Sequence, residues 1–360
     1  MAATTFLPSW VYASAAVAER EHTHYVNRCW HPVAAASALP EGGALAVELL
    51  NLPLLLTRPA GADGEPRAFH NRCPHRGVAL LASGSGQAPC RRLICPYHGW
   101  TYDLQGRLLA AAREADFLEP FRRADWPLQG LPCRQLGPLI WVALATDPLP
   151  LEHQLDLVLA EAGELLAQPR VLLAREQAPL ACNWKVAHDN TLDDYHVAIA
   201  HPTTLHREQG PVRDYRYALS PHASLLASPH GAGTFYTFGL APWTHLLLWP
   251  DGRLALISFL PTGLDRCSME VGLYGPAALA PSAEAWLAEM RTFLAEDRRL
   301  VESAQRAYAS GLRPGPVHRL EQRIVQWQAL YNRLMDFSTA DLTTADLTTA
   351  AGAATPPWRH

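Results

Sequence analysis

The sequence predicts an α+β protein with two domains, because two β-rich stretches are separated by a proline-rich segment and the second is accompanied by helical patterns. From about residue 25 to residue 145, short apolar or alternating segments are broken by glycine and proline, which is typical of an all-β domain. A proline-rich hinge follows at residues 147–151. A second β-rich tract covers about 216–274, and a long amphipathic helix covers about 282–308.

We therefore assign residues 25–147 to a first domain with an N-terminal extension of residues 1–24, and residues 148–337 to a second domain. A chain of 360 residues is long enough for both domains to bury a core. Residues 338–360 repeat a unit of small polar side chains that cannot bury a core, so we expect a disordered tail.

The composition is that of a globular protein, with 49% hydrophobic residues and a net charge of −4. This charge gives no electrostatic reason to expect nucleic acid or an anionic membrane as a partner. Seven scattered cysteines make a poor disulfide framework and indicate a reducing compartment. The N-terminus lacks the basic region of a signal peptide, and no apolar run approaches the ~18 residues of a membrane span. We therefore expect a cytoplasmic protein.

Two short boxes in the first domain combine cysteine with histidine. Cys73 and His75 lie in CPHRG, Cys95 and His98 lie in CPYHGW, and nineteen residues separate the boxes. Two thiolates and two imidazoles at this spacing are ligands for zinc or for a two-iron cluster with mixed ligation. We favour the cluster, because each box offers one thiolate and one imidazole, and one iron of such a cluster takes both thiolates while the other takes both imidazoles. Zinc is the alternative.

A second set of candidate ligands lies in the sequence NWKVAHDNTLDDYHVAIAHPTTL. Asp193 and His196 are three residues apart, which places them on one face of a predicted helix. His201 lies about 140° further round an ideal helix, so it meets His196 only if the helix loosens or ends. Pro202 disfavours helical geometry at His201. Two imidazoles at this spacing suit an iron that still lacks one carboxylate.

The long predicted helix supplies a candidate carboxylate. Its apolar stripe passes through Met290, Phe293 and Val301 in helical steps and also contains Asp297. A carboxylate in an apolar stripe is costly unless it is paired or bound to a cation. Pairing with a buried arginine is one interpretation, but the two upstream histidines favour ligation of a metal by Asp297. Glu296 falls off the stripe and needs no such partner.

Both sets of residues resemble one known family. The two boxes, with Arg76 and Trp100 beside them, resemble the Rieske signature. NWK followed by D-N, D-x-Y-H and a further histidine resembles the catalytic motif of Rieske non-haem iron oxygenases, and the stretch around Asp297 resembles the segment that carries their third ligand. The chain is similar to compact α (oxygenase) subunits, such as vanillate demethylase-like or choline monooxygenase-like proteins.

The resemblance implies an N-terminal all-β Rieske domain and a catalytic domain with an antiparallel sheet flanked by helices. It implies a [2Fe-2S] Rieske cluster, whose ligands would be Cys73, His75, Cys95 and His98. It also implies a mononuclear Fe(II), whose ligands would be His196, His201 and Asp297. Asp193 matches the carboxylate that joins the mononuclear site to a cluster histidine of a neighbouring subunit. The resemblance therefore also implies a homotrimer, supplied with electrons by a separate reductase or ferredoxin.

The expected function is that of a terminal oxygenase, which uses dioxygen and externally supplied electrons to hydroxylate or oxidatively demethylate a small organic substrate. One alternative is an aromatic-ring cis-dihydroxylating dioxygenase. An alternative of another class is a Rieske electron-transfer protein without oxygenase activity. No pattern in the sequence identifies the substrate.

Overall fold

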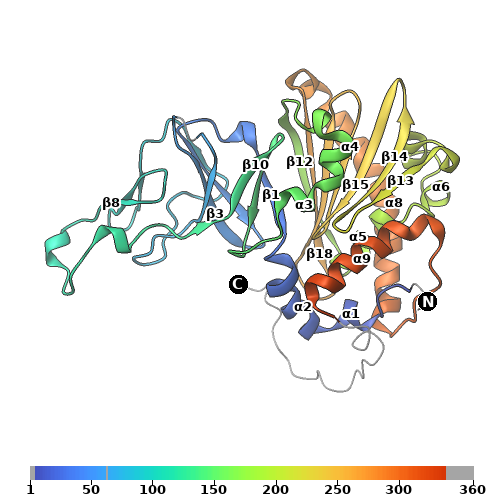
Figure 1. Ribbon diagram of the computed structural model, residues 1–360, viewed down its shortest axis with the longest axis horizontal. Coiled ribbons are helices and arrows are strands. Elements are labelled where there is room, and N and C mark those ends of the chain that lie inside the picture. The colour runs from blue at the N-terminus through green and yellow to red at the C-terminus, as the bar shows by residue number, and fades with distance from the viewer. Residues whose placement is uncertain (1–4, 62–63, 338–360) are drawn as a thin grey trace. The chain divides into compact units, whose positions relative to one another are not determined.

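The computed structural model describes residues 5–61 and 64–337 (Figure 1), and the predicted tail lies outside them. The chain forms two compact units: a β unit, Trp30–Pro148, and an α+β unit, which combines the chain up to Cys29 with the chain from Leu149 onward. The predicted α+β class, with an all-β domain followed by a domain of helices on an antiparallel sheet, is confirmed.

The β unit is built from short antiparallel strands in three small sheets, with strand orders β1-β11-β10, β5-β2-β3-β4-β9 and β6-β7-β8. Its strands are β1 (Trp30–Ala35), β2 (Gly43–Leu49), β3 (Leu52–Arg58), β4 (Arg67–His70), β5 (Gly86–Gln87), β6 (Leu93–Ile94), β7 (Thr101–Tyr102), β8 (Leu108–Ala110), β9 (Gly130–Leu131), β10 (Cys133–Leu136) and β11 (Leu139–Ala143). Short 3-10 turns occupy η2 (Ala36–Ala38), η3 (Glu114–Asp116) and η4 (Arg123–Asp125). One hydrophobic cluster packs Phe69 and Leu80 around the two cysteine-containing loops.

The α+β unit is organised on a seven-stranded antiparallel sheet with the order β12-β18-β17-β16-β15-β14-β13. Its strands are β12 (Val171–Leu180), β13 (Arg216–Leu219), β14 (Ala223–His230), β15 (Gly233–Leu240), β16 (Thr244–Leu248), β17 (Leu254–Pro261) and β18 (Cys267–Gly275). Consecutive strands from β13 to β18 are neighbours, as in a meander, and β12 completes the edge beside β18.

Helices from several parts of the chain accompany this sheet. They are α1 (Trp10–Ala13), α2 (Ala15–Glu21), the π-helix η1 (His22–Val26), α3 (Leu151–Gln154), α4 (Asp156–Leu166), α5 (Trp184–Leu192), α6 (Val197–Ala200), α7 (Leu205–Gln209), α8 (Ala283–Ala309) and α9 (Gln322–Met335), with 3-10 turns η5 (Val212–Asp214), η6 (Ala277–Ser282) and η7 (Arg319–Glu321). Helix α5 packs on β16 and β17, α9 packs on β14 and β15, and α8 lies beside α5 (Figure 1). Leu192 of α5 contacts the sheet at Gly239, where any side chain would collide with it.

The N-terminal segment is part of the α+β unit, whereas the sequence analysis treated residues 1–24 as an extension of the first domain. Its side chains form buried polar contacts there: the Tyr12 hydroxyl donates to Asp189 Oδ2 at 2.6 Å, and Lys185 Nζ pairs with Glu21 Oε1 at 2.6 Å. The Tyr25 hydroxyl donates to the Pro242 carbonyl at 3.0 Å. Sequence patterns do not reveal which domain such a segment covers.

His188 of α5 makes the stability of the protein depend on pH. Its side chain is 1% exposed and packs against the Trp327 ring at 5.2 Å. Burial disfavours the imidazolium, and the nearby Arg323 adds to this, so the pKa of His188 falls to about 3. A histidine with a lowered pKa contributes stability that is present above the unfolded-state value of about 6.5 and is lost as the pH falls toward the folded value.

We therefore expect a His188→Leu variant to lose less stability than the wild type on acidification. The difference in unfolding free energy between the two proteins should shift by about 2 kcal/mol in favour of the variant between pH 7 and pH 5. Chemical denaturation followed by tryptophan fluorescence at both pH values measures this, with a His24→Leu variant at an exposed position as the control. Parallel pH profiles of the wild type and His188→Leu would contradict the prediction.

Candidate metal centres

The two Cys–His boxes of the β unit fold into matching loops. In the first, the Cys73 N–H donates to the Val78 carbonyl and the Gly77 N–H donates to the Cys73 carbonyl, both at 2.8 Å. In the second loop, the Cys95 N–H donates to the Trp100 carbonyl at 2.8 Å, and the Gly99 N–H donates to the Cys95 carbonyl at 3.0 Å. Gly77 and Gly99 have positive φ angles of 77° and 69°, which only glycine adopts without strain and which close the two loops.

Each loop holds its thiol inside the unit and its imidazole toward the surface. Cys73 and Cys95 are 1% and 3% exposed, whereas His75 is half-buried and His98 is exposed. The two imidazole rings lie next to each other, with their centroids 4.6 Å apart. The Cys73 thiol contacts the Tyr102 hydroxyl at 3.4 Å, and burial raises its pKa, as does the neighbouring Cys95 thiol.

This donor set fits a mixed two-iron cluster. Two buried thiols and two outer imidazoles provide one iron with sulfur ligands and the other with nitrogen ligands. The Nδ1 atom of His75 is buried and has no hydrogen-bond partner among the described residues, an arrangement that costs free energy unless a ligand engages the atom. Its ring is held flat against Trp100, with an interplanar angle of 2° and a centroid distance of 4.9 Å.

The second set of predicted ligands meets in the α+β unit. His196 precedes α6, His201 follows α6, and Asp297 lies in the middle of α8. One ligand atom of each residue lies within 4.8 Å of the others, the arrangement that a shared metal ion requires. His201 Nε2 is 2.8 Å from Asp297 Oδ1 and 3.3 Å from His196 Nε2, and His196 Nε2 is 3.3 Å from the same carboxylate oxygen.

The electrostatics of these three residues are those of a cation site. Burial opposes ionisation of Asp297, but hydrogen bonds from His196 and His201 outweigh it and keep the pKa of Asp297 below its usual range. Burial also disfavours the His196 imidazolium, yet Asp193 and Asp297 outweigh this effect and raise its pKa to about 10. A carboxylate and two imidazoles that share one small space therefore attract positive charge, which an iron ion can supply.

Each imidazole also has an outer carboxylate partner. Asp193 Oδ2 lies 3.2 Å from His196 Nδ1, and Glu296 Oε2 lies 2.7 Å from His201 Nδ1. Glu296 also accepts a hydrogen bond from the Thr204 hydroxyl at 2.7 Å. Such partners fix the orientation and tautomer of a ligating histidine, so that the other ring nitrogen faces the metal.

The expected continuous helix through Asp193 and His196 is wrong. Helix α5 ends at Leu192, and Asp193 is already extended, with φ −88° and ψ 101°. The two side chains meet across the short linker of residues 193–196 rather than on one helical face. At His201 the chain leaves helical geometry, with φ −124° and ψ 47°, as the following proline predicted.

Glu296 is a functional candidate whose partners its position off the apolar stripe does not predict. We expect a Glu296→Ala variant to bind Fe(II) at least about 10-fold more weakly, because His201 loses the acceptor that orients it. Glu296→Gln keeps an acceptor oxygen and should lose less. Chelator competition measures the affinity, and Glu289→Ala, an exposed position on the same helix, is the control. Wild-type affinity in Glu296→Ala would show that His201 is oriented without it.

Comparisons with known proteins agree with this architecture. Residues 29–122 match the family model of the Rieske [2Fe-2S] domain, and residues 170–233 match that of the ring hydroxylating alpha subunit (catalytic domain). The chain belongs to the Rieske non-haem iron oxygenases, as a compact α (oxygenase) subunit. Its two domain types are those that carry a [2Fe-2S] Rieske cluster and a mononuclear iron, so the predicted cofactors are confirmed at the level of the domains.

Individual relatives add detail. The carnitine monooxygenase oxygenase subunit of Acinetobacter pittii is 29% identical over 326 residues, which are 84% of this chain and 85% of that protein. The glycine betaine monooxygenase oxygenase subunit of Pseudomonas aeruginosa is 31% identical over 207 residues, which are 55% of this chain and 45% of that protein. The chain thus matches somewhat less than half the length of the glycine betaine relatives.

Solved structures give the same family. A quaternary ammonium Rieske monooxygenase, described in relation to carnitine oxidation and inter-subunit electron transfer, superposes with a TM-score of 0.81 at 25% identity, over 92% of this chain and 95% of that one. Naphthalene 1,2-dioxygenase shares the fold, with a TM-score of 0.74 at 16% identity over 94% of each chain. None of the helices in residues 5–61 and 64–337 has both the length and the apolar character needed to cross a membrane.

Proposed function

We propose that the chain is the terminal oxygenase of a multicomponent system, which takes electrons from a separate reductase or ferredoxin and inserts oxygen from O2 into a small organic substrate. The observation that carries this proposal is the convergence of His196, His201 and Asp297 on one point, in a chain that also holds the two Cys–His loops. An electron carrier would need the loops alone.

In this proposal Cys73, His75, Cys95 and His98 hold the cluster, and His196, His201 and Asp297 hold the mononuclear iron. When bound, the cluster passes on single electrons and the iron activates dioxygen. The protein contributes a ligand set of two imidazoles and one carboxylate, which leaves coordination positions open for dioxygen beside the substrate. Asp193 and Glu296 orient the imidazoles through their Nδ1 atoms.

The proposal also includes the assembly. Asp193 Oδ2 lies 3.2 Å from His196 Nδ1, Oδ1 accepts a hydrogen bond from the Tyr195 N–H at 2.8 Å, and the side chain is 23% exposed, so a carboxylate lone pair is still accessible to a further donor. We propose that this donor is a cluster histidine of a neighbouring subunit in a homotrimer, and the inter-subunit electron transfer described for the quaternary ammonium relative supports it. We also propose a cytoplasmic location, because the seven scattered cysteines of the sequence make a poor disulfide framework.

For the reaction, we favour monooxygenation at a methyl group, by hydroxylation or oxidative demethylation. The two relatives named above are a carnitine and a glycine betaine monooxygenase subunit, so small quaternary amines are the first substrates to test. The dihydroxylating alternative rests only on a shared fold with naphthalene 1,2-dioxygenase.

The test combines metal analysis with oxygen uptake. The oxygenase requires three irons per chain, two of them in the cluster, whereas an electron carrier contains two. With a generic reductase, dioxygen consumption and formaldehyde release are then measured against quaternary amines and methoxyaromatic acids. Two irons per chain, or full iron occupancy without oxygen uptake on any of these substrates, would contradict the proposed activity.

A further inference from the structure

A buried ion pair lies directly beside the proposed iron ligands and has no role in the scheme above. Asp194 and Arg323 have side chains that are 2% and 0% exposed, and Arg323 Nη1 lies 3.1 Å and 3.4 Å from the two carboxylate oxygens. Removing two charges from water costs several kcal/mol for each ion, and an apolar pair would be at least as stable. Its position therefore calls for an explanation other than stability.

Arg323 of α9 reaches three strands of the sheet as well as Asp194. Its Nε donates to the Ser224 hydroxyl of β14 at 3.4 Å, and its Nη2 donates to the Thr237 carbonyl of β15 at 3.2 Å. The same Nη2 lies 3.4 Å from His245 Nε2 on β16. A planar guanidinium with five donors is the side chain that can hold such divergent partners at once. Arg323 thereby fixes Asp194 relative to the sheet.

The linker of residues 193–196 is held by further contacts to the same segment, residues 318–323. The Asp194 N–H donates to the Leu320 carbonyl at 3.3 Å, and the Tyr195 ring stacks on His318 with a centroid distance of 4.0 Å. Within the linker, the Tyr195 N–H donates to Asp193 Oδ1 at 2.8 Å. Asp193 and His196 thus flank Asp194 and Tyr195, which both contact segment 318–323.

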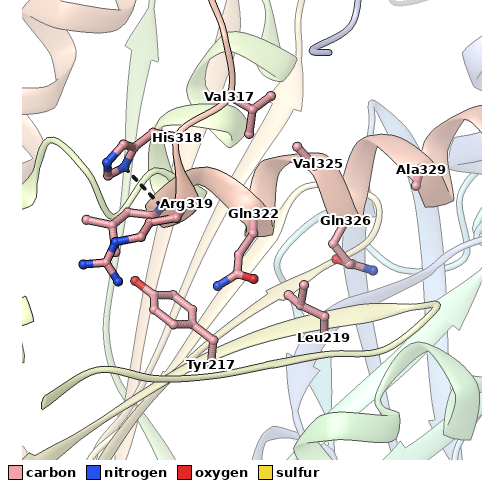
Figure 2. Close-up of a pocket in the computed structure, with 10 residues that line it drawn as sticks. Tyr217, Leu219, Val317, His318, Arg319, Gln322, Val325, Gln326 and Ala329 are labelled. Carbon is pink, nitrogen blue, oxygen red and sulfur yellow. Dashed lines mark hydrogen bonds between the residues drawn. The ribbon is translucent and has the colours of Figure 1, made fainter. Parts of the chain in front are cut away.

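A groove lies beside this segment, between β13 and the start of α9, with a volume of about 730 Å³. Figure 2 shows His318, Arg319 and Gln322 along it. The His318 Nδ1 atom accepts a hydrogen bond from the Leu320 N–H at 3.2 Å, which caps the start of the turn. Arg319 belongs to the same turn, is exposed, and takes no part in the Asp194–Arg323 ion pair.

We propose that Asp194 and Arg323 are positioning residues for the iron site. Their ion pair sets the path of linker 193–196, so that His196 presents Nε2 to His201 and Asp297 while Asp193 keeps its contact with His196 Nδ1. The inference rests on the proposed function, because it assigns a purpose to the pair only if His196 binds iron.

The decisive variant is the double replacement Asp194→Asn/Arg323→Gln, in which a neutral amide pair replaces the ion pair and the shorter glutamine cannot span the three strands. We expect its melting temperature to fall less than that of Arg323→Gln alone, because no buried charge is left unpaired. Its Fe(II) affinity should fall at least about 10-fold. The electron paramagnetic resonance spectrum of the Fe(II) site with nitric oxide as a probe should broaden, because His196 is no longer held in one orientation.

Single variants separate charge from position. Arg323→Gln alone leaves Asp194 buried and unpaired, and should lower the melting temperature by about 10 °C. Arg323→Lys keeps the positive charge but lacks the planar guanidinium with its several donors. Relative to Arg323→Gln, it should therefore recover much of the melting temperature and little of the Fe(II) affinity. Arg319→Met is the matched control and should change neither quantity.

Wild-type Fe(II) affinity and an unchanged nitric oxide spectrum in the double variant would overturn the positioning role and leave the pair as a structural feature. A wild-type protein that binds no Fe(II) at His196, His201 and Asp297 would overturn the proposed function and this inference together. Both measurements are independent of turnover, so neither requires knowledge of the substrate.

Discussion

At saturating iron, an Asp193→Ala variant is expected to hold both metal centres and yet lose on the order of 100-fold in turnover, the scale of loss that follows when reacting groups are no longer aligned. Asp193 is not among the three residues that converge on the iron position, so the mononuclear site should still form. The variant removes only the carboxylate that contacts His196 Nδ1 and that we propose to join two subunits.

Stopped-flow spectroscopy distinguishes this effect from loss of iron. The cluster of Asp193→Ala should be reduced at the wild-type rate by a chemical reductant, but its reoxidation in the presence of substrate and dioxygen should be slow. Asp193→Glu, which restores a carboxylate, should recover part of the rate. Full turnover by Asp193→Ala at saturating iron would mean that electrons reach the iron without this residue.

The second large effect is expected for Asp297→Ala, which should lose the mononuclear iron and all detectable oxygen uptake. Asp297 is the carboxylate of the three converging residues, and both imidazoles contact its Oδ1, at 2.8 Å and 3.3 Å. Without it, two neutral ligands remain for a cation that prefers a charged oxygen donor.

Iron analysis of Asp297→Ala should fall from three irons per chain to two, with the visible absorption of the cluster unchanged. Asp297→Glu keeps a carboxylate one methylene further from the helix and should bind iron weakly. Three irons per chain in Asp297→Ala would remove Asp297 from the ligand set and, with it, the main support for the proposed activity.

Part of this architecture is legible from the sequence because the chemistry is local. A cysteine and a histidine within four residues, followed by a glycine, predict a tight ligand loop, and both loops fold in this way around Gly77 and Gly99. The helical steps that include Asp297 predict that it faces the interior, where the structure places it beside His196 and His201. That these residues bind iron stays a prediction.

Other features depend on contacts between distant segments, which spacing does not encode. Glu296 lies off the apolar stripe of α8, but the turn between α6 and α7 brings His201 and Thr204 to it. Asp194 follows Asp193 directly in the sequence, and only the fold shows that its side chain turns inward to Arg323, which is 129 positions away. No local sequence pattern distinguishes an arginine that is buried in the core from one on the surface.

The N-terminal segment has a consequence for the connectivity of the chain. Because residues up to Cys29 pack with the α+β unit, the β unit is an insertion within it, entered at Trp30 and left at Pro148. The two crossing points are neighbours: Leu149 N–H donates to the Arg28 carbonyl at 2.8 Å, and Trp30 pairs with Ala143. A short glycine-containing connector from Arg28 to Leu149 would therefore remove the whole insertion and give a continuous polypeptide that keeps the proposed iron ligands and lacks the proposed cluster ligands.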